Sequence, residues 1–170
     1  MDPSSLAGAN KQRLRWILSQ AELRLDAQLD FARAADQRAS TLSGAAAAMA
    51  AAATAVFAQA IESGKASPLA VAGIVAAIGF SSSTYFAIRS AKCHDFHPPG
   101  YRPVDFIDDV QTARAEEAIL RDIACGLNSR LAFNSDRLSE RGALADKAIN
   151  IMAATPVLAL LLSVAYALVF

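Results

Sequence analysis

Residues 39–61 read ASTLSGAAAAMAAAATAVFAQAI, a run of 23 residues without a charged side chain. About 20 apolar residues in a helix are enough to cross the ~30 Å hydrocarbon core of a bilayer. Alanine makes the run only weakly hydrophobic, but its polar members are small hydroxyls and Gln59 near the far end. Lipid offers the backbone no hydrogen-bond partner, so a spanning segment of this kind has to be helical. We therefore expect residues 39–61 to form the first transmembrane helix.

Two further windows free of charge have a similar length, 21 residues at 68–88 and 23 at 148–170. The whole chain is 54% hydrophobic but only 7% aromatic, and its mean hydropathy is +0.30. A composition rich in alanine and poor in large rings is unusual for a soluble core and ordinary for helices that pack closely in lipid. The sequence predicts an all-α integral membrane protein with three transmembrane helices.

The basic residues are unevenly distributed, although 16 basic and 16 acidic residues cancel and give no general case for nucleic acid binding. Six lie before residue 39, one lies in the connection 62–67, and nine lie between Arg89 and Lys147. Segments rich in Lys and Arg stay in the cytoplasm. We expect a cytoplasmic N-terminus and a periplasmic C-terminus. Residues 1–10 should be a flexible tail, and no cleavable signal is visible.

The charged segments have helical patterns of their own. Residues 11–38 contain no Gly or Pro, and an apolar stripe recurs at spacings of three and four: Leu14, Leu18, Ala21, Leu25, Leu29 and Ala32. A loop rich in helix breakers follows the second window at 92–103. A helical region at 104–147, starting near Val104, should then run into the third window, with the stripe Leu120, Ile123, Leu127, Leu131, Asn134, Leu138, Ala145 and Ile149. We expect two cytoplasmic helices that are continuous with the first and third spans.

Four charged residues fall at the predicted cytoplasmic membrane surface: Asp36, Arg38, Arg141 and Lys147. Partly dehydrated charges at this level would respond to rotation of their helices, so we interpret the four as a collar that could act as a switch. The alternative for Arg38 is that it only anchors the helix end.

Asn134 interrupts the second stripe at a position where leucine would stabilise more. A single Asn in such a seam often specifies register or oligomeric state, so we predict an oligomer seam of Leu127, Leu131, Asn134 and Leu138. Replacing Asn134 with Leu should then raise stability and alter oligomer size. The alternative is that the stripe drifts and exposes Asn134.

Small and hydroxyl residues mark the predicted spans. Gly44, Ala48 and Ala52 are spaced by four, as are Gly73 and Ala77, which permits close approach of helices. Residues 81–84 read SSST. These hydroxyls could line a polar path, but more often they bond to carbonyls of their own helix.

Little in the sequence indicates an enzyme, a metal or a cofactor. Cys93, His94 and His97 could in principle hold zinc, but the nearby Pro-Pro-Gly and the lack of a second ligand pair favour a polar turn next to the membrane. Catalytic motifs and a glycine-rich phosphate loop are absent. Cys93 and Cys125 are interpreted as free thiols, because both lie in segments assigned to the cytoplasm.

Two short motifs resemble a known family. Asp36-x-Arg38-Ala39 leading into a span is similar to the Asp-x-Lys-Ala motif of the Pycsar transmembrane effectors (PycTM), and Asn134-Ser135-x-x-Leu138-x-x-Arg141 resembles their later Asn-Ser…Lys segment. Arg stands here in both places where the family has Lys. The layout is also similar to that of small SLATT-type membrane effectors of bacterial antiphage defence.

The resemblance implies a function. Infection would produce a cyclic pyrimidine nucleotide, cUMP or cCMP, made by a neighbouring cyclase, and the protein would respond as a homo-oligomer by impairing the inner membrane and halting the infected cell. Since no recognisable cyclic-nucleotide module is present, the nucleotide would have to bind the cytoplasmic helices. Arg114, Arg121 and Arg130 are the candidate phosphate ligands, or else surface ion-pair partners. The rival hypothesis is a non-signalling oligomeric scaffold or accessory channel subunit.

Overall fold

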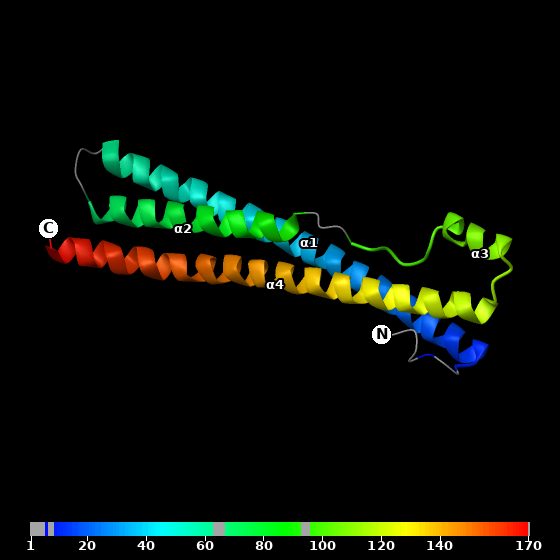
Figure 1. Ribbon diagram of the computed structural model, residues 1–170. Coiled ribbons are helices and arrows are strands. Elements are labelled where there is room, and N and C mark those ends of the chain that lie inside the picture. The colour runs from blue at the N-terminus through cyan, green and yellow to red at the C-terminus, as the bar shows by residue number, and fades with distance from the viewer. Residues whose placement is uncertain (1–5, 7–8, 63–66, 93–95, 170) are drawn as a thin grey trace. The chain divides into compact units, whose positions relative to one another are not determined.

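In the computed structural model, residues 6, 9–62, 67–92 and 96–169 are described, and over these residues the chain is helical with no strand. The long helices are α1 (Lys11–Glu62), α2 (Pro68–Ala91) and α4 (Glu116–Val169) (Figure 1). A 3-10 turn, η2 (Pro103–Phe106), and the five-residue α3 (Ile107–Gln111) lie between α2 and α4. The helical fold class is therefore confirmed for the described part of the chain.

Three helices, α1, α2 and α4, are long and apolar enough to cross a membrane. The windows predicted from sequence lie inside them, apart from residue 170, which is outside the described residues. Helix α1 has 52 residues and α4 has 54, so each is about 80 Å long at 1.5 Å per residue. A bilayer core takes up well under half of that length.

The connection between α2 and α4 differs from the expected continuous helix beginning near Val104. Residues 112–115 interrupt it, because Ala113 has a left-handed backbone with φ of 49°. The break is stabilised by the Arg114 N–H, which donates to the Asp109 carbonyl at 3.1 Å. Helix α4 then starts afresh with two acids, Glu116 and Glu117, in its first turn. Acidic side chains there oppose the helix dipole favourably.

Two compact units divide the chain, and α1 and α4 contribute residues to both. The first unit comprises residues 1–33 and 94–139. Its core combines the first part of α1 with the first part of α4: Leu14, Leu25 and Leu127 are fully buried there, and Ala124 nearly so. Leu6 joins this cluster next to Leu14. The buried members of the two apolar stripes predicted from sequence therefore form the core of this unit. The last two members of the second stripe, Ala145 and Ile149, belong instead to the second unit, and Ile149 is 51% exposed.

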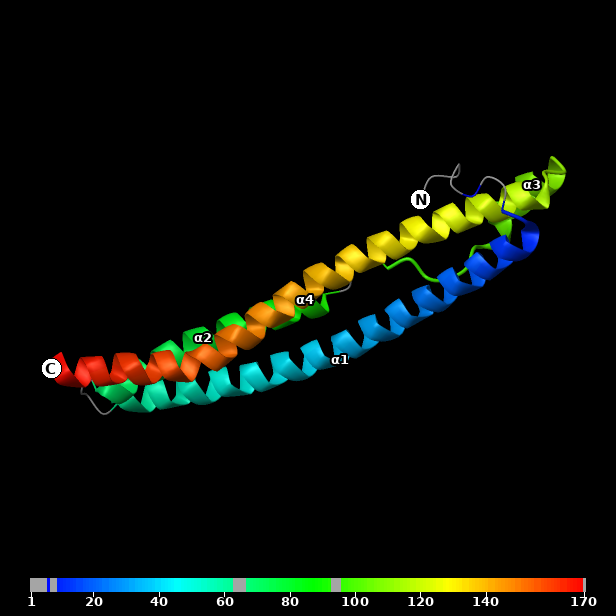
Figure 2. The same ribbon diagram turned by 90° about the horizontal axis from the view of Figure 1, so that it is seen from below.

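The second unit comprises residues 34–93 and 140–170 and contains the apolar parts of α1, α2 and α4. Both views show α2 running antiparallel to α4 (Figures 1 and 2). The buried face of α1 here is a row of alanines spaced by seven, Ala39, Ala46, Ala53 and Ala60. Gly44, Ala48 and Ala52, spaced by four, are instead exposed, so this row does not form the contact face of α1 within the single chain.

Close packing and a hydrogen bond from a serine hydroxyl join α2 to its neighbours in this unit. A Cβ added at Gly73 would lie 2.9 Å from the backbone nitrogen of Phe57, so only glycine fits against α1 at this point. Ser83 Oγ donates to the Ala148 carbonyl on α4 at 2.8 Å. Ser82 and Thr84 bond to carbonyls of their own helix, as the sequence favoured. Ser83 departs from that expectation and links two helices.

Candidate functional site

Arg141 joins three helices in the second unit. Its guanidinium is almost fully buried and forms an ion pair with Asp36 of α1. Its Nε donates to the Ser90 carbonyl of α2 at 2.9 Å, and Ser90 Oγ donates back to the Arg141 carbonyl at 3.1 Å. A buried guanidinium is costly unless its charge is matched and its N–H groups are bonded. This cluster therefore constrains the rotation of all three helices.

The structure brings together only two of the four residues predicted to form the charged collar. Asp36 and Arg141 form the ion pair, with the Asp36 side chain half exposed. Arg38 and Lys147 are exposed on α1 and α4, consistent with anchoring. Ser90 was missed by sequence reasoning, because a serine at the end of an apolar helix carries no distinctive pattern. The switch role of the collar stays a prediction.

Asn134 is fully buried by a loop of its own chain. Its Oδ1 accepts from the His97 N–H at 3.0 Å, and its Nδ2 donates to the His97 carbonyl at 3.0 Å. The His97 ring also packs on Phe133, with ring centroids 4.8 Å apart. Asn134 therefore attaches the loop after α2 to α4. Its carboxamide pairs with the N–H and the carbonyl of His97 as the main chain of a neighbouring β-strand would.

The predicted oligomer seam needs a correction for this reason. Leu127 and Asn134 have no exposed surface in a single chain, so they cannot form a surface between copies in this conformation. Leu131 and Leu138 are partly buried in the same row. The alternative, that a drifting stripe exposes Asn134, is also wrong.

Two of the residues considered for a zinc site, Cys93 and His94, lie outside the described residues. Cys125 is a free cysteine.

Two of the three arginines proposed for phosphate binding have other partners. Arg114 pairs with Asp109 at 3.1 Å and Asp122 at 2.5 Å, and these hydrogen bonds raise the pKa of its guanidinium. Arg130 donates to the Gly100 carbonyl at 2.5 Å and lies 4.1 Å from the Tyr101 ring centroid. Both arginines therefore stabilise loops.

Tyr101, on which the Arg130 guanidinium packs, is held in place by a contact with α4. Its hydroxyl donates to the Ile123 carbonyl at 3.3 Å, and burial raises the pKa of this phenol. Gly126 lets the hydroxyl approach, since a Cβ there would overlap it. Arg121 differs from the other two arginines, because its buried Nε has no hydrogen-bond partner among the described residues.

A groove of about 270 Å³ lies in the first unit, between α1 and α4. Its lining includes the small side chains of Ala21 and Ala124. Trp16, Ile17 and Leu131 supply larger apolar surface, while Gln20, Arg24 and Asn128 supply polar groups. The Trp16 side chain is 65% exposed, unusually high for an indole. Trp16 is the chain's single tryptophan.

The groove offers a combination of groups that suits a planar, anionic ligand. The indole can stack on an aromatic ring, the carboxamides of Gln20 and Asn128 both donate and accept, and Arg24 supplies a positive charge. One turn beyond Arg24, Gln28 Nε2 donates to the Leu131 carbonyl at 3.2 Å, and its buried Oε1 has no partner among the described residues. Sequence reasoning missed this groove, because its lining combines Ala21 and Ala124 from distant segments, and no sequence pattern marks an alanine as part of a groove.

Comparison of the chain with protein-family models, with curated proteins and with solved structures gives no match.

Proposed function

We propose that the chain is a signal-gated membrane effector in which a small ligand binds the first unit and changes the membrane-embedded helices. The observation that carries this proposal is helix continuity. Helix α1 contributes to both units and has no Gly or Pro between Lys11 and Ser43. Since an uninterrupted helix does not bend sharply, rotation at one end reaches the other.

The membrane setting follows from length and charge. Three helices have the length and hydropathy to span, and the basic residues lie before the first and between the second and third apolar windows. In the proposed topology the N-terminus is cytoplasmic and the C-terminus periplasmic, in a bacterial inner membrane. Three spans are too few to enclose an aqueous pore, so activity requires a homo-oligomer.

The ligand we propose is a cyclic pyrimidine nucleotide, cUMP or cCMP, as the resemblance to the PycTM effectors implies. The groove beside Trp16 supports this choice. Stacking of a base on an aromatic side chain contributes about 1–3 kcal/mol, and Arg24, the arginine that lines the groove, can meet a phosphate. In this reading the effector acts in antiphage defence by abortive infection, and it is not an enzyme.

Binding can be tested through the single tryptophan. Titrating the purified full chain in detergent with cUMP or cCMP should quench or shift Trp16 emission, and adenosine 3′,5′-cyclic monophosphate serves as a purine comparison. Arg24→Ala should weaken the response at least about tenfold, the effect of losing one charge-assisted hydrogen bond. Arg33→Ala is the matched control, because Arg33 is an equally exposed arginine of α1 that lies outside the groove.

Activity is tested separately with a membrane-potential dye in cells that express the protein with and without the nucleotide. Depolarisation only with the nucleotide, lost in Arg24→Ala and kept in Arg33→Ala, is the expected result. Binding with unchanged potential would overturn the effector function and favour the oligomeric scaffold. An unresponsive Trp16 together with depolarisation would move the ligand site away from the groove.

A further inference from the structure

One face of α2 is exposed along most of the helix and is apolar apart from Ser81. Ile74, Ile78, Tyr85 and Ile88 recur at near-helical spacing and are 41%, 62%, 54% and 56% exposed. The opposite face is buried against the other helices of the second unit through Gly73, Ser83, Ala87 and Ser90. The exposed row therefore faces away from the protein, toward whatever surrounds the bundle.

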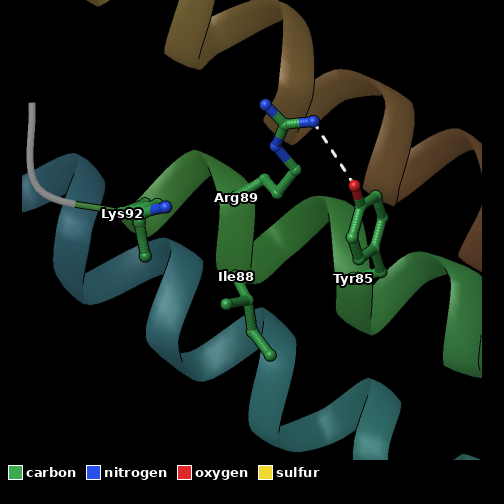
Figure 3. A pocket seen from close by; sticks show the side chains of 5 residues that line it. Tyr85, Ile88, Arg89 and Lys92 are labelled. Atoms are coloured by element: carbon green, nitrogen blue, oxygen red, sulfur yellow. Dashed lines mark hydrogen bonds between the residues drawn. The ribbon is translucent and has the colours of Figure 1, made fainter.

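This row ends at an open hollow of about 680 Å³ lined by Tyr85, Ile88, Arg89, Ala91 and Lys92. Arg89 lies on the same helix face, since it follows Tyr85 by four residues, and Lys92 is the C-cap residue directly after the end of α2. Arg89 Nη1 donates to Tyr85 Oη at 3.3 Å, and its guanidinium lies 5.9 Å from the ring centroid. Figure 3 shows these two side chains turned toward each other and Lys92 at the end of the helix.

We infer that this face is a binding site for an anionic diacyl phospholipid. The isoleucine row provides a surface for the acyl chains, and Tyr85 lies near the end of this row, four residues before Arg89. Tyrosine favours that level of a membrane because its ring is apolar and its hydroxyl is polar. Arg89 and Lys92 then meet the phosphate and the negative headgroup. The tyrosine hydroxyl holds Arg89 in place before the lipid arrives.

Charge complementarity favours an anionic lipid at this end of the bundle. No basic residue lies between Pro68 and Ile88, so the two cations at the end of α2 are the first charges that the exposed row meets. Each Lys or Arg near an anionic membrane surface contributes about fivefold to affinity. The inference requires membrane insertion and is independent of any nucleotide signal.

The test uses the full chain in non-ionic detergent and native mass spectrometry, which counts retained lipids. Dioctanoyl phosphatidylglycerol should bind in preference to dioctanoyl phosphatidylcholine. Arg89→Ala/Lys92→Ala should weaken the preferred lipid about 25-fold, by two contributions of about fivefold. Lys147→Ala is the control, since it removes another exposed cation at the predicted membrane surface outside this hollow.

Tyr85→Phe provides a second variant that keeps every charge and all apolar surface. It should weaken phosphatidylglycerol binding by a smaller factor, because only the bond that orients Arg89 is lost. Equal binding of the two lipids, or an equal loss in Lys147→Ala, would overturn the site. Competition by glycerol 3-phosphate at the same concentration as the lipid would overturn the assignment to a lipid and indicate a free phosphate ligand.

Discussion

The two units solve the same packing problem with different side chains. In the first unit α1 buries Leu14 and Leu25, whereas in the second unit the same helix buries Ala39, Ala46, Ala53 and Ala60. Water drives leucines together because burial removes apolar surface from solvent. In lipid there is no hydrophobic driving force between helices, so they associate there through close contact and hydrogen bonds. The change from buried leucine to buried alanine along α1 thus marks where, in the proposed topology, the surroundings of the helix change from water to lipid.

The comparison predicts opposite responses to side-chain size. Leu25→Ala should lower the free energy of unfolding of the first unit by about 3 kcal/mol, because it leaves a cavity. Ala46→Leu should lower that of the second unit by about 1–3 kcal/mol through overpacking. Chemical denaturation followed by Trp16 emission reports the first unit, and far-ultraviolet circular dichroism reports all helices.

The matched controls lie next to these positions on exposed faces. Leu23→Ala and Ala47→Leu make the same chemical changes at exposed residues of α1 and should have much smaller effects. If Ala46→Leu were as harmless as Ala47→Leu, the alanine row would not be a contact face. If Leu25→Ala left the Trp16 transition unchanged, leucine burial would not stabilise the first unit.

A second prediction concerns the polar contact inside the leucine-rich unit. Asn134→Leu should lower the free energy of unfolding by about 1–2 kcal/mol, because it leaves the N–H and carbonyl of His97 without their partner. This reverses the sequence-based expectation that leucine would stabilise. The exposed neighbour change Ser135→Ala is the control. Thermal melting gives the stability, and faster tryptic cleavage after the exposed Lys92, at the start of the loop, gives loop release.

The smallest predicted effect is electrostatic. Hydrogen bonds from Lys11 and Arg15 lower the pKa of Glu116 below its ordinary value of 4.5. A lowered folded-state pKa means that the stabilisation is complete above pH 4.5 and is lost as pH falls through the folded-state pKa. Glu116 is exposed at the start of α4, so the effect should be slight.

Melting temperatures of the first unit between pH 6 and pH 3, followed by Trp16 emission, measure this effect. The wild-type chain should lose more stability on acidification than Glu116→Gln. The control Glu117→Gln removes the neighbouring carboxylate, which forms no ion pair among the described residues, and should behave as the wild type does. Identical acid responses of all three proteins would contradict the assignment.

The sequence predicted the elements better than their contacts. Charge-free windows and stripes of leucine are local patterns, so the three long helices and the burial of Leu14, Leu25 and Leu127 could be anticipated. The collar placed Asp36 and Arg141 at the same predicted depth, but their ion pair was not anticipated. In residues 45–53, by contrast, nearly every position is alanine, and such a helix has no face that hydropathy can distinguish.

Three features depended on three-dimensional information. The partner of Asn134 is the backbone of a residue 37 positions away, which no side-chain pattern encodes. The break before α4 rests on a left-handed alanine, a conformation that favours glycine. The groove is lined by Ala21 of α1 and Ala124 of α4, which come from distant segments of the chain. Sequence reasoning could find charges and periods, but not which small residues would leave space.

The equal spacing of the buried alanines in α1 affects how uniquely the packing register of this helix is defined. Four identical side chains recur every seven residues, so a slip of one repeat, about 10 Å along the axis, would present nearly the same surface. The alanine row alone then leaves several registers almost equal in energy. The contact of Gly73 with Phe57 and the ion pair of Asp36 with Arg141 each occur once, so they select one register and make the others costly.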